Sequence, residues 1–460
     1  MRPSPETAPA PERRPARGDE LELTIDSLAY GGSGVARSDG YVVFVRGGVP
    51  GDRVRARVTK RKRAYAEARL VELLAPSPDR IAARAEHPGA PWQVLPYERQ
   101  LEHKRAQVID ALERIGHFPD PPVEPMLAAV EHWRYRNKVE YSFGEAVGRD
   151  ELVLGFHRPG SWAEIAPIDD DVLASERVGE LRRRVEDWCQ AEGLSTYDRR
   201  DNSGFLRNLV VREGRRSGQL QARIVTSDGD FRASEFTAAL AEVADSVLWT
   251  RAAGVAETTR GGETDLLAGD EAIAEELSGL RLLISPEAFF QTNTEMAERL
   301  YATAAELVQL TGSERVLDLY CGIGTIALML ARQAGEVWGL ELIEPAIRDA
   351  ERNAELNGID NARFRAGDVR TTLRPLLEQA GTPDVVVLDP PRAGLSQKIV
   401  RRVLEAGAAR IVYVSCNPTT LAPNARQLVD AGYELKSVRP VDMFPQTPHI
   451  ECVALLERLD

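Results

Sequence analysis

Residues 410–420 read RIVYVSCNPTT, a stretch in which an apolar run leads directly into a cysteine and a proline. Residues 411–414 are β-branched and aromatic, which predicts a short buried strand. The strand should end at Ser415 and Cys416, because Pro418 cannot donate a hydrogen bond to a β-ladder. A cysteine at the end of a parallel strand lies where open α/β sheets bind ligands and place chemistry. The alternative is an inert buried thiol, which is what most cysteines are.

An upstream stretch has the pattern of a nucleotide-type binding turn. Residues 316–320 form an apolar strand, residues 322–324 a Gly-x-Gly turn, and residues 326–334 a helix. Glycine lets the backbone approach a ligand closely at such a turn. The third glycine of the dinucleotide pattern is missing, so the turn does not predict phosphate binding.

Two acids flank this turn in sequence and indicate which ligand it suits. Asp318 precedes the glycines, where it would repel a pyrophosphate and attract a cation. The next predicted strand, residues 337–341, ends in Glu341, close to the spacing of an acid that binds a ribose. An acid, the glycines and a second acid in this order fit S-adenosylmethionine better than NAD.

Further strands extend the same pattern downstream. They are predicted at residues 362–364 and 384–388, and strands alternate with helices from residue 315 to residue 430, which predicts a doubly wound parallel sheet. The fourth strand ends in the sequence DPPR at residues 389–392. This resembles a motif of amino-group methyltransferases, which place an aromatic residue where this chain has Arg392.

Cys416 indicates a different target atom. Methylation of a nitrogen needs no cysteine, whereas C5 of a pyrimidine becomes nucleophilic only after a thiolate adds at C6. A base must then remove the C5 proton so that the thiolate can leave. Glu451, at the start of a predicted strand over residues 453–456, is the candidate base, and His449 and Asp389 are the alternatives.

The N-terminal part predicts a small β-barrel over residues 19–76. Arginines alternate with apolar residues over 53–58, and residues 60–63 extend the basic side. A basic strand suits nucleic-acid phosphates, although most charge runs are merely solvated faces. The phrases SLAYGGSGVAR at 27–37 and GGVPGDRVRARV at 47–58 resemble the TRAM domain, an RNA-binding barrel of the oligonucleotide-binding type.

The remaining segments are less distinctive. Residues 1–18, rich in proline, alanine and arginine, predict a disordered tail. Residues 77–280 predict an α+β middle domain, in which the basic and aromatic residues 133–138 suit either RNA contact or an ordinary hairpin edge. The acidic, glycine-containing stretch 257–279 is expected to be rich in loops.

Composition sets broad limits. The chain has 460 residues, 43% apolar and 28% charged, which fits a globular protein of two or three domains. A net charge of -13 argues mildly against bulk nucleic-acid binding but does not exclude a local basic surface. No apolar run approaches the roughly 20 residues of a membrane span, so no membrane association is expected. The four cysteines form no C-x-x-C pair, so neither a metal site nor disulfides are expected, and free thiols suit the cytoplasm.

Five phrases together resemble the RNA uracil-C5 methyltransferase family: SPEAFFQTN at 285–293, VLDLYCGIGT at 316–325, LDPPRAGL at 388–395, VSCNPTTLA at 414–422 and FPQTPHIECV at 444–453. The resemblance extends over nearly the whole chain. It implies that residues 281–460 form a Rossmann-like methyltransferase domain, with Cys416 as the nucleophile and Glu451 as the base. It also implies that four side chains contact S-adenosylmethionine: Gln291, Tyr320, Glu341 and Asp389.

The resemblance implies an enzyme that methylates C5 of a uridine in RNA and that works as a cytoplasmic monomer. The barrel favours 23S ribosomal RNA, because transfer-RNA members of the family typically lack it. The alternatives are a transfer-RNA target, a small-molecule substrate and a non-catalytic RNA-binding protein. The presence of Cys416 and Glu451 speaks against a non-catalytic role, and the basic strand over 53–63 speaks against a small-molecule substrate.

One departure from the family concerns a metal cluster. Many members hold an iron–sulfur cluster through cysteines before a Trp/Leu-Gln phrase and through one later cysteine. Here the corresponding segments read EHPGAPWQ at 86–93 and IDDD at 168–171, with no cysteine. We therefore expect no iron–sulfur cluster, and we expect packing alone to hold the middle domain in shape.

Overall fold

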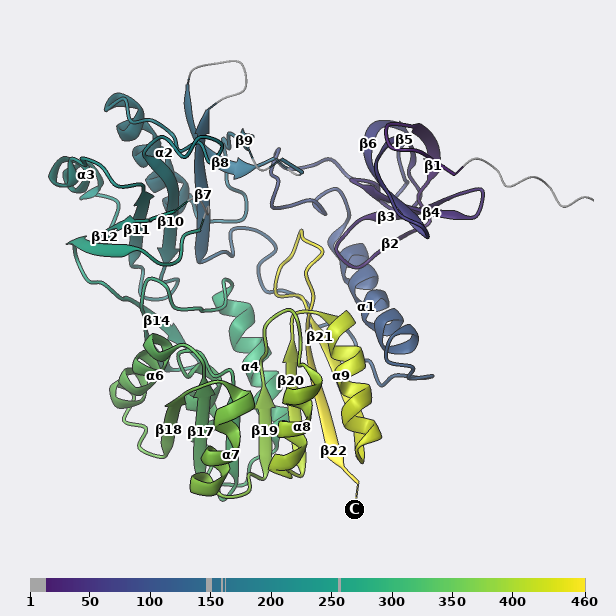
Figure 1. The fold of residues 1–460 in the computed structure, drawn as a ribbon, viewed down its shortest axis with the longest axis vertical. Coiled ribbons are helices and arrows are strands. Elements are labelled where there is room, and N and C mark those ends of the chain that lie inside the picture. The colour runs from purple at the N-terminus through teal and green to yellow at the C-terminus, as the bar shows by residue number, and fades with distance from the viewer. Residues whose placement is uncertain (1–13, 146–150, 159, 162, 255–257, 460) are drawn as a thin grey trace, which may run out of the picture. The chain divides into compact units, whose positions relative to one another are not determined.

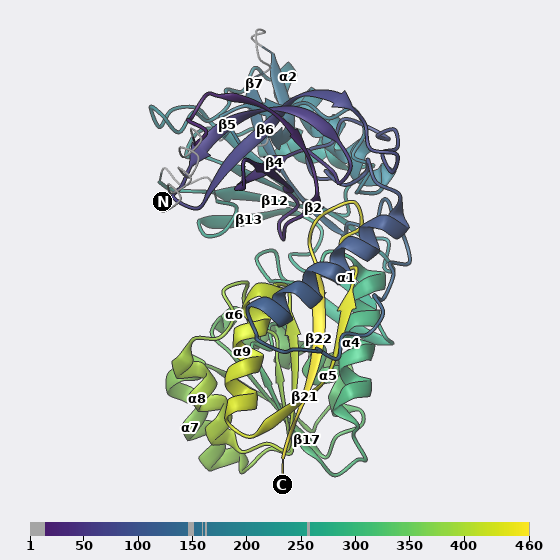
Figure 2. The same ribbon diagram turned by 90° about the vertical axis from the view of Figure 1, so that its right-hand side faces the viewer.

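The computed structural model describes residues 14–145, 151–158, 160–161, 163–254 and 258–459. The chain divides into two compact units (Figure 1, Figure 2). The first comprises Met1–Ala83, Pro91–Gln107 and Gln446–Pro448, and the second comprises Arg84–Ala90, Val108–Pro445 and His449–Asp460. Helix α1 (Tyr97–Arg114) contributes residues to both units. Every helix among the described residues is too short or too polar to span a lipid bilayer.

Six strands of the first unit form one curved sheet, in the order β1-β5-β6-β4-β3-β2. Their bounds are β1 Glu20–Thr24, β2 Ser27–Leu28, β3 Gly34–Ser38, β4 Tyr41–Arg46, β5 Arg53–Arg61 and β6 Tyr65–Ala75. Alternate residues of β5, Val54, Ala56 and Val58, are buried against Val43 and Val45. The period-two pattern at 53–58 therefore marks a strand with one buried face, as predicted.

Part of the tail predicted over residues 1–18 lies outside the described residues, which begin at 14. At its other end, the N–H of Gly18 donates to the carbonyl of Val58 at 2.9 Å, and the N–H of Ala16 donates to the carboxylate of Asp19 at 2.8 Å. These bonds attach the last residues of this segment to the six-stranded sheet.

The second unit contains a seven-stranded sheet in the order β13-β12-β11-β10-β7-β8-β9. The bounds are β7 Lys138–Glu145, β8 Leu152–His157, β9 Ile165–Ala166, β10 Leu206–Glu213, β11 Leu220–Thr226, β12 Ser246–Arg251 and β13 Glu263–Ala268. Helices α2 (Glu176–Ala191) and α3 (Ala233–Leu240) contribute to its hydrophobic core. That core includes Tyr141, Leu209 and Ile224 of the sheet and Phe236 of α3.

Residues 257–279 were expected to be rich in loops, and for half of the described part of this stretch, which forms two strands, the expectation is wrong. β13 is the edge strand of the seven-stranded sheet, and β14 (Ile273–Leu277) pairs with β15 (Leu280–Ile284). Arg251 of β12 forms ion pairs with Glu263 at 3.1 Å and Asp265 at 2.6 Å. Acidic residues that suggest a loop in sequence thus stabilise an edge strand through a partner that is distant in sequence.

A buried hydrogen-bonded network joins the two segments in which cluster cysteines are absent. His87 Nε2 lies 2.9 Å from Asp171 Oδ1, and both side chains are 1% exposed. The hydroxyl of Tyr141 donates to Asp171 Oδ2 at 2.6 Å. Because the N–H of Gly89 donates to His87 Nδ1 at 3.1 Å, Nε2 carries the proton that faces Asp171. The expectation that packing alone holds this region is therefore wrong, since polar bonds cross-link it as well.

The last sheet of the second unit has the order β18-β17-β16-β19-β20-β22-β21. Its strands are β16 Arg315–Leu319, β17 Glu336–Glu341, β18 Ala362–Ala366, β19 Val385–Leu388, β20 Arg410–Ser415, β21 Tyr433–Val441 and β22 Glu451–Arg458. Neighbours from β18 to β20 are parallel, whereas β22 is antiparallel to β20 and to β21. This is the predicted doubly wound sheet, to which β21 is an addition that the sequence pattern did not indicate.

Helices connect these strands and cover both faces of the sheet (Figure 1). Their bounds are α4 Thr294–Val308, α5 Thr325–Ala331, α6 Glu344–Leu356, α7 Val369–Ala380, α8 Gln397–Ala406 and α9 Pro418–Asp430. The strand order reverses between β16 and β19, and in open sheets the carboxyl ends of the strands at such a point form the ligand crevice. The glycine turn at 322–324, the DPPR sequence at 389–392 and Cys416 each follow a strand of this sheet.

Candidate active site

Two strands that are distant in sequence bring Cys416 and Glu451 together. The antiparallel register of β20 and β22 pairs Ser415 with Cys452. One step further along this ladder, Cys416 and Glu451 are neighbours in register. Glu451 is 4% exposed at the first position of β22, and Cys416, just after β20, is partly exposed. The predicted nucleophile and the predicted base therefore share one end of the sheet.

Burial and negative neighbours set the protonation of this pair. Burial first, and then the charges of Glu451 and Asp389, raise the pKa of the Cys416 thiol to about 11. Burial and then Asp389 raise the pKa of Glu451 well above its ordinary value. Burial raises the pKa of Asp389, at the end of β19, to about 7. In the free protein at neutral pH, the thiol therefore holds its proton, and the site disfavours the ionised form of Glu451.

Arg392 is the cation of this site, and its role was not recognised in the sequence. Its charge lowers the pKa values of both Cys416 and Glu451, against the effects that raise them. Its backbone carbonyl accepts a hydrogen bond from the side-chain amide of Asn417 at 3.1 Å, which holds Arg392 beside the loop that carries Cys416. Its Nη2 lies 2.8 Å from His449 Nδ1, and because a guanidinium only donates, that imidazole nitrogen accepts. The only signal in the sequence was that Arg392 replaces an aromatic residue.

The glycine turn after β16 adopts a conformation that few residues tolerate. Tyr320 has a φ of 69°, and Gly324, which caps the N-terminus of α5, has a φ of 84°. On β17, a Cβ at Gly339 would lie 2.5 Å from the ring of Phe364 and 2.8 Å from Cys321 Sγ. Only glycine at 339 lets Phe364 and Cys321 pack this closely against β17, which fixes the position of the turn.

Glu341 ends β17 beside this turn. Its carboxylate accepts hydrogen bonds from the N–H groups of Gly322 at 3.2 Å and Ile343 at 3.0 Å. Leu342 and Ile343, which follow, are 62% and 54% exposed, unusual values for large apolar side chains beside a binding turn. The two predicted cofactor residues Tyr320 and Glu341 thus flank the same turn, next to the exposed apolar side chains of Leu342 and Ile343.

The surroundings of Asp318 indicate which charge the ligand of this site should carry. Its side chain is fully buried, and neither carboxylate oxygen has a close hydrogen-bond partner. Burial, and then Asp389 and Glu341, raise its pKa to about 8, against the nearby backbone amide of Ala327. A cluster of buried acids fits a cationic ligand that neutralises it, and the sulfonium and ammonium groups of S-adenosylmethionine are such charges.

Gln291 reaches the site through a residue that the sequence did not indicate. Its backbone carbonyl accepts a bond from the Asn137 side chain at 2.9 Å, and its side chain is hydrogen-bonded to Tyr301 of α4. Burial, followed by Asp389 and Glu451, raises the pKa of Tyr301 well above its ordinary value. Tyr301 therefore stands among the acids of the site as a neutral phenol. It lies on α4 and carries no sequence signal of its own.

The described residues contain no group of three or more histidine, cysteine, aspartate or glutamate side chains arranged to hold a metal ion. The four cysteines, Cys189, Cys321, Cys416 and Cys452, are all free and lie far apart in sequence. His87 and Asp171 are hydrogen-bonded to each other rather than arranged as ligands. The residues present therefore do not fit an iron–sulfur cluster.

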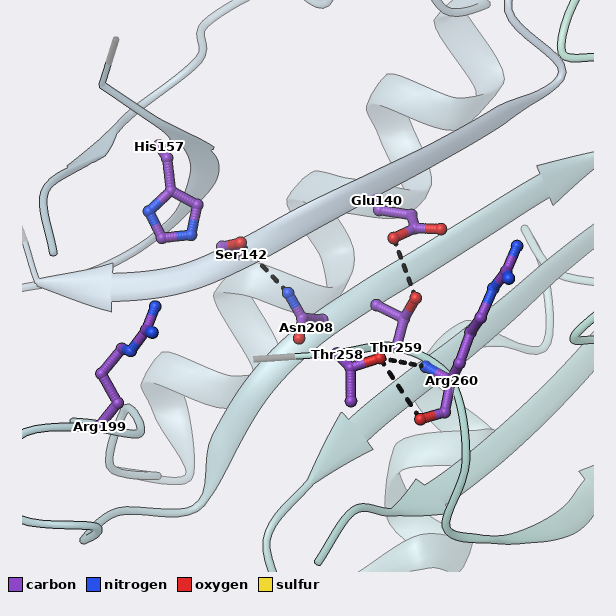
Figure 3. Close-up of a pocket in the computed structure, with 8 residues that line it drawn as sticks. All are labelled: Glu140, Ser142, His157, Arg199, Asn208, Thr258, Thr259 and Arg260. Carbon is purple, nitrogen blue, oxygen red and sulfur yellow. Dashed lines mark hydrogen bonds between the residues drawn. The ribbon is translucent and has the colours of Figure 1, made fainter. Parts of the chain in front are cut away.

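A separate cavity of about 620 Å³ lies on the sheet formed by β7 to β13 (Figure 3). Its lining is entirely polar: Glu140, Ser142, His157, Arg199, Asn208, Thr258, Thr259 and Arg260. The amide of Asn208 donates to Ser142 Oγ at 3.2 Å, and the hydroxyl of Thr259 donates to Glu140 at 2.9 Å. None of the residues at the ends of β16, β17, β19 and β20 contributes to it.

The basic strand of the first unit is largely neutralised. Arg55 forms ion pairs with Glu22 at 3.2 Å and with Glu72. Arg57 binds Glu20 at 2.6 Å, and Lys60 lies 3.4 Å from Glu67. The alternation of arginines was read correctly, but the neighbouring strands β1 and β6 present acids to the same face. Among the described residues, Arg61, Lys62 and Arg63 at the end of the strand form no ion pair.

Comparisons with known proteins identify relatives of this chain. Residues 279–459 match the tRNA (uracil-5-)-methyltransferase family model, and residues 15–71 match the TRAM domain model. An uncharacterized RNA methyltransferase of Halalkalibacterium halodurans is 38% identical over 453 residues, which cover 96% of this chain and 97% of that protein. A second one, from Gloeobacter violaceus, is 40% identical, with 96% and 97% covered.

A solved structure extends the likeness to three dimensions. It is the tRNA (uracil-54, C5)-methyltransferase of Pyrococcus abyssi in complex with S-adenosyl-L-homocysteine. It is 30% identical, has a TM-score of 0.76, and matches 95% of this chain and 100% of that chain. The likeness therefore includes the six-stranded sheet, because residues 15–71 are too long a segment to fall in the small unmatched remainder.

Proposed function

Since the chain belongs to the tRNA (uracil-5-)-methyltransferase family, we propose that it methylates C5 of a uridine in ribosomal RNA through a covalent bond between Cys416 and C6. It is an S-adenosylmethionine-dependent RNA methyltransferase. The observation that carries the proposed mechanism is the β20–β22 register, which makes Cys416 and Glu451 neighbours. A non-catalytic RNA-binding protein would have no need for a thiol and a buried carboxyl group at the same strand ends.

We assign the cofactor to four side chains: Gln291, Tyr320, Glu341 and Asp389. Two observations support them, the backbone of the turn at Tyr320 and the buried acids that a cationic ligand would neutralise. When bound, S-adenosylmethionine supplies an electrophilic methyl group. Within this chain, the exposed step of Leu342 and Ile343 offers an apolar surface to the adenine ring.

Cys416 begins the chemistry on the base. The thiol loses its proton, a step that the charge of Arg392 favours because it lowers the thiol pKa. Sulfur then forms a bond to C6, and the electron pair of the C5–C6 double bond shifts toward the C4 oxygen. C5 thereby becomes nucleophilic. The target base must leave its stack to reach the strand ends, as other base-modifying enzymes require.

Glu451 ends the chemistry. Once ionised, its carboxylate takes the proton from C5, the C5–C6 double bond re-forms and the bond between C6 and sulfur breaks. The raised pKa of Glu451 makes it a strong base in its ionised form. The alternative bases are less suited: Nδ1 of His449 already accepts a hydrogen bond from Arg392, and Asp389 follows β19, whereas Glu451 is the register neighbour of Cys416.

The test compares two variants on RNA that carries 5-fluorouridine or uridine at the target. Cys416→Ala should neither methylate nor form an adduct. Glu451→Gln should add and transfer the methyl group but fail to release the RNA, so methylated RNA stays attached to the protein. Wild type should be trapped in the same way by 5-fluorouridine, because fluorine cannot leave as a cation. The adduct is read as a slow band on a denaturing gel and by intact mass spectrometry.

Each result has a clear counterpart that would count against the proposal. Uracil methylation by Cys416→Ala would exclude the covalent route. Normal turnover by Glu451→Gln without a trapped species would transfer the role of base to His449 or Asp389.

Ribosomal RNA is the proposed target because the chain carries a TRAM domain. Transfer RNA is the second candidate, because the matching Pyrococcus abyssi enzyme is named for a tRNA uridine and shares the TRAM region. Mass-spectrometric mapping of 5-methyluridine in both RNA classes, from cells with and without the gene, distinguishes them. Loss of the modified base from tRNA alone would contradict the ribosomal assignment.

We further propose that the middle domain contacts this RNA and that the protein works as a monomer in the cytoplasm. The polar cavity of Figure 3, with Arg199 and Arg260 at its lining, supports RNA contact. One chain contains both Cys416 and Glu451, so a second copy is not needed to complete the site. Four free thiols suit a reducing compartment.

A further inference from the structure

A basic groove lies between α7 and α8, which Figures 1 and 2 show side by side on the catalytic sheet. Its volume is about 440 Å³. Five cations and one acid line it: Arg370, Arg374, Lys398, Arg401, Arg402 and Glu405. Since α7 and α8 follow parallel strands by right-handed connections, this groove lies on the face of the sheet opposite α5 and α6.

The acidic side chains in and beside the groove are already paired with arginines. Glu405 binds Arg374 at 2.9 Å and Arg402 at 2.6 Å, and these two arginines lower its pKa to about 2. Asp368, next to the groove, pairs with Arg370. Lys398 and Arg401 are exposed and form no ion pair among the described residues. The groove therefore keeps an uncompensated positive charge at the start and middle of α8.

This charge stands out against the rest of the chain. The whole protein carries a net charge of -13, so a polyanion is repelled by most of its surface. In the six-stranded sheet, Arg55, Arg57 and Lys60 are paired with glutamates. In the concave lining of the groove, Lys398 and Arg401 remain uncompensated, and a local positive charge on an acidic protein selects for a partner rich in phosphate.

The groove begins beside the candidate active site. Helix α8 starts at Gln397, directly after the loop that carries Asp389 and Arg392. At the other wall, Arg370 is close enough to Tyr320 to lower the pKa of its phenol, although burial and Asp368 raise that pKa more. A strand of RNA whose target base enters at Cys416 would therefore meet these cations through its neighbouring phosphates.

We propose that the groove between α7 and α8 binds two successive phosphates of the substrate RNA, held chiefly by Lys398 and Arg401. This inference rests on the proposed RNA substrate but not on the covalent mechanism. Phosphate contacts of this kind fix the register of the RNA without reading its sequence. They also release counterions, so they leave a measurable signature in the salt dependence of binding.

The experiment uses the full-length protein and a fluorescein-labelled single-stranded oligouridine, with affinity measured between about 50 and 200 mM salt. The double variant Lys398→Ala/Arg401→Ala should bind more weakly. The slope of log affinity against log salt should be shallower by about 1.4, since each phosphate contact of a single strand contributes about 0.7. Affinity for S-adenosylmethionine, measured by calorimetry, should not change, because neither residue belongs to the cofactor site.

A matched control removes two exposed cations elsewhere. Arg348→Ala/Arg352→Ala, on α6 at the opposite face, changes the net charge by the same amount and should leave the slope as in wild type. An unchanged slope in the groove variant would overturn the proposal, and so would an equal change in both variants, which would show an effect of net charge alone. Failure of uracil methylation in wild type would instead refute the proposed function, since RNA binding is measured without turnover.

Discussion

Cys416 is surrounded by charges that act in opposite directions. Burial, Glu451 and Asp389 raise the pKa of its thiol to about 11, and Arg392 alone among the charged neighbours lowers it. A nucleophile with this pKa is almost entirely protonated at neutral pH. The cationic cofactor would reduce the effect of the acids, but the charge that this chain itself supplies is that of Arg392.

Replacement of Arg392 by glutamine should therefore slow methylation. Without the guanidinium, the pKa of the Cys416 thiol rises further, and each additional unit lowers the thiolate fraction about tenfold. The pH–rate profile should consequently shift to higher pH, and adduct formation with 5-fluorouridine RNA should slow in parallel. Both are measured as rates at pH values below the thiol pKa of about 11, where the thiolate fraction still rises with pH.

Two control variants separate charge from structure. Arg392→Lys keeps the positive charge and should recover part of the rate, whereas His449→Ala removes only the hydrogen-bond partner and should leave the profile near that of wild type. An unshifted profile in Arg392→Gln would mean that Arg392 does not tune the thiol.

At the scale of elements, Asp171 links the segment 84–90 to strand β7 through hydrogen bonds with His87 and Tyr141. Burial raises the pKa of this carboxyl group, but hydrogen bonds from His87 and Tyr141 and from the Leu173 backbone outweigh it, so the net pKa lies below the ordinary value. A group with a depressed folded pKa contributes stability above its unfolded pKa, and this stability is lost as pH falls through the folded pKa. The window is thus acidic, below about pH 4, the ordinary pKa of an aspartate.

Asp171→Asn should destabilise the protein by about 1–3 kcal/mol at neutral pH, the cost of leaving a buried hydrogen-bond donor without its acceptor. The difference from wild type should shrink in acid, because wild type then loses the same charge. Denaturant unfolding at pH 7 and at pH 3 measures both values. The neighbouring Asp170→Asn removes only a half-exposed partner of Arg134 and should cost no more than about 1 kcal/mol. Equal costs at positions 170 and 171 would contradict the role of the buried network.

At the scale of the whole molecule, RNA binding has to be reconciled with a net charge of -13. The six-stranded sheet was expected to provide a basic face, but most cations of β5 are paired with acids of β1 and β6. Among the described residues, Arg53 at the start of β5 and Arg61, Lys62 and Arg63 at its end form no ion pair, so the charge that this strand offers to phosphates lies at its two ends. Electrostatic contact is thus expected at a few local sites rather than over a broad basic surface.

This distribution predicts different effects along the same strand. Lys62→Ala/Arg63→Ala should weaken oligouridine binding and flatten its salt slope by about 1.4, the value for two phosphate contacts on a single strand. Arg57→Ala/Glu20→Ala removes a whole ion pair without changing the net charge, and it should leave the slope unchanged. Fluorescence titrations at several salt concentrations compare the two. A larger effect of the second variant would mean that the paired arginines bind RNA and exchange their glutamates for phosphates.

The sequence alone was sufficient for the features that depend on local patterns. The alternation of strands and helices from 315 to 430 predicted the doubly wound sheet, because buried parallel strands are continuous apolar runs bounded by turns. The TRAM resemblance was found from the two phrases at 27–37 and 47–58, and the family model confirms it. Cys416 was singled out because a proline follows it at the end of an apolar run. The stretch 257–279 was misread, because its strands are defined by pairing rather than by pattern.

Only the tertiary structure decided what depends on proximity between distant residues. The register of β20 with β22 places Glu451 beside Cys416, and packing of α4 brings Tyr301 to the same acids. Arg392 became the cation of the site because folding places it near both Cys416 and Glu451. The groove of α7 and α8 likewise forms from residues of two helices. Such sites depend on pairwise distances, and a linear pattern does not contain the distances between its separate parts.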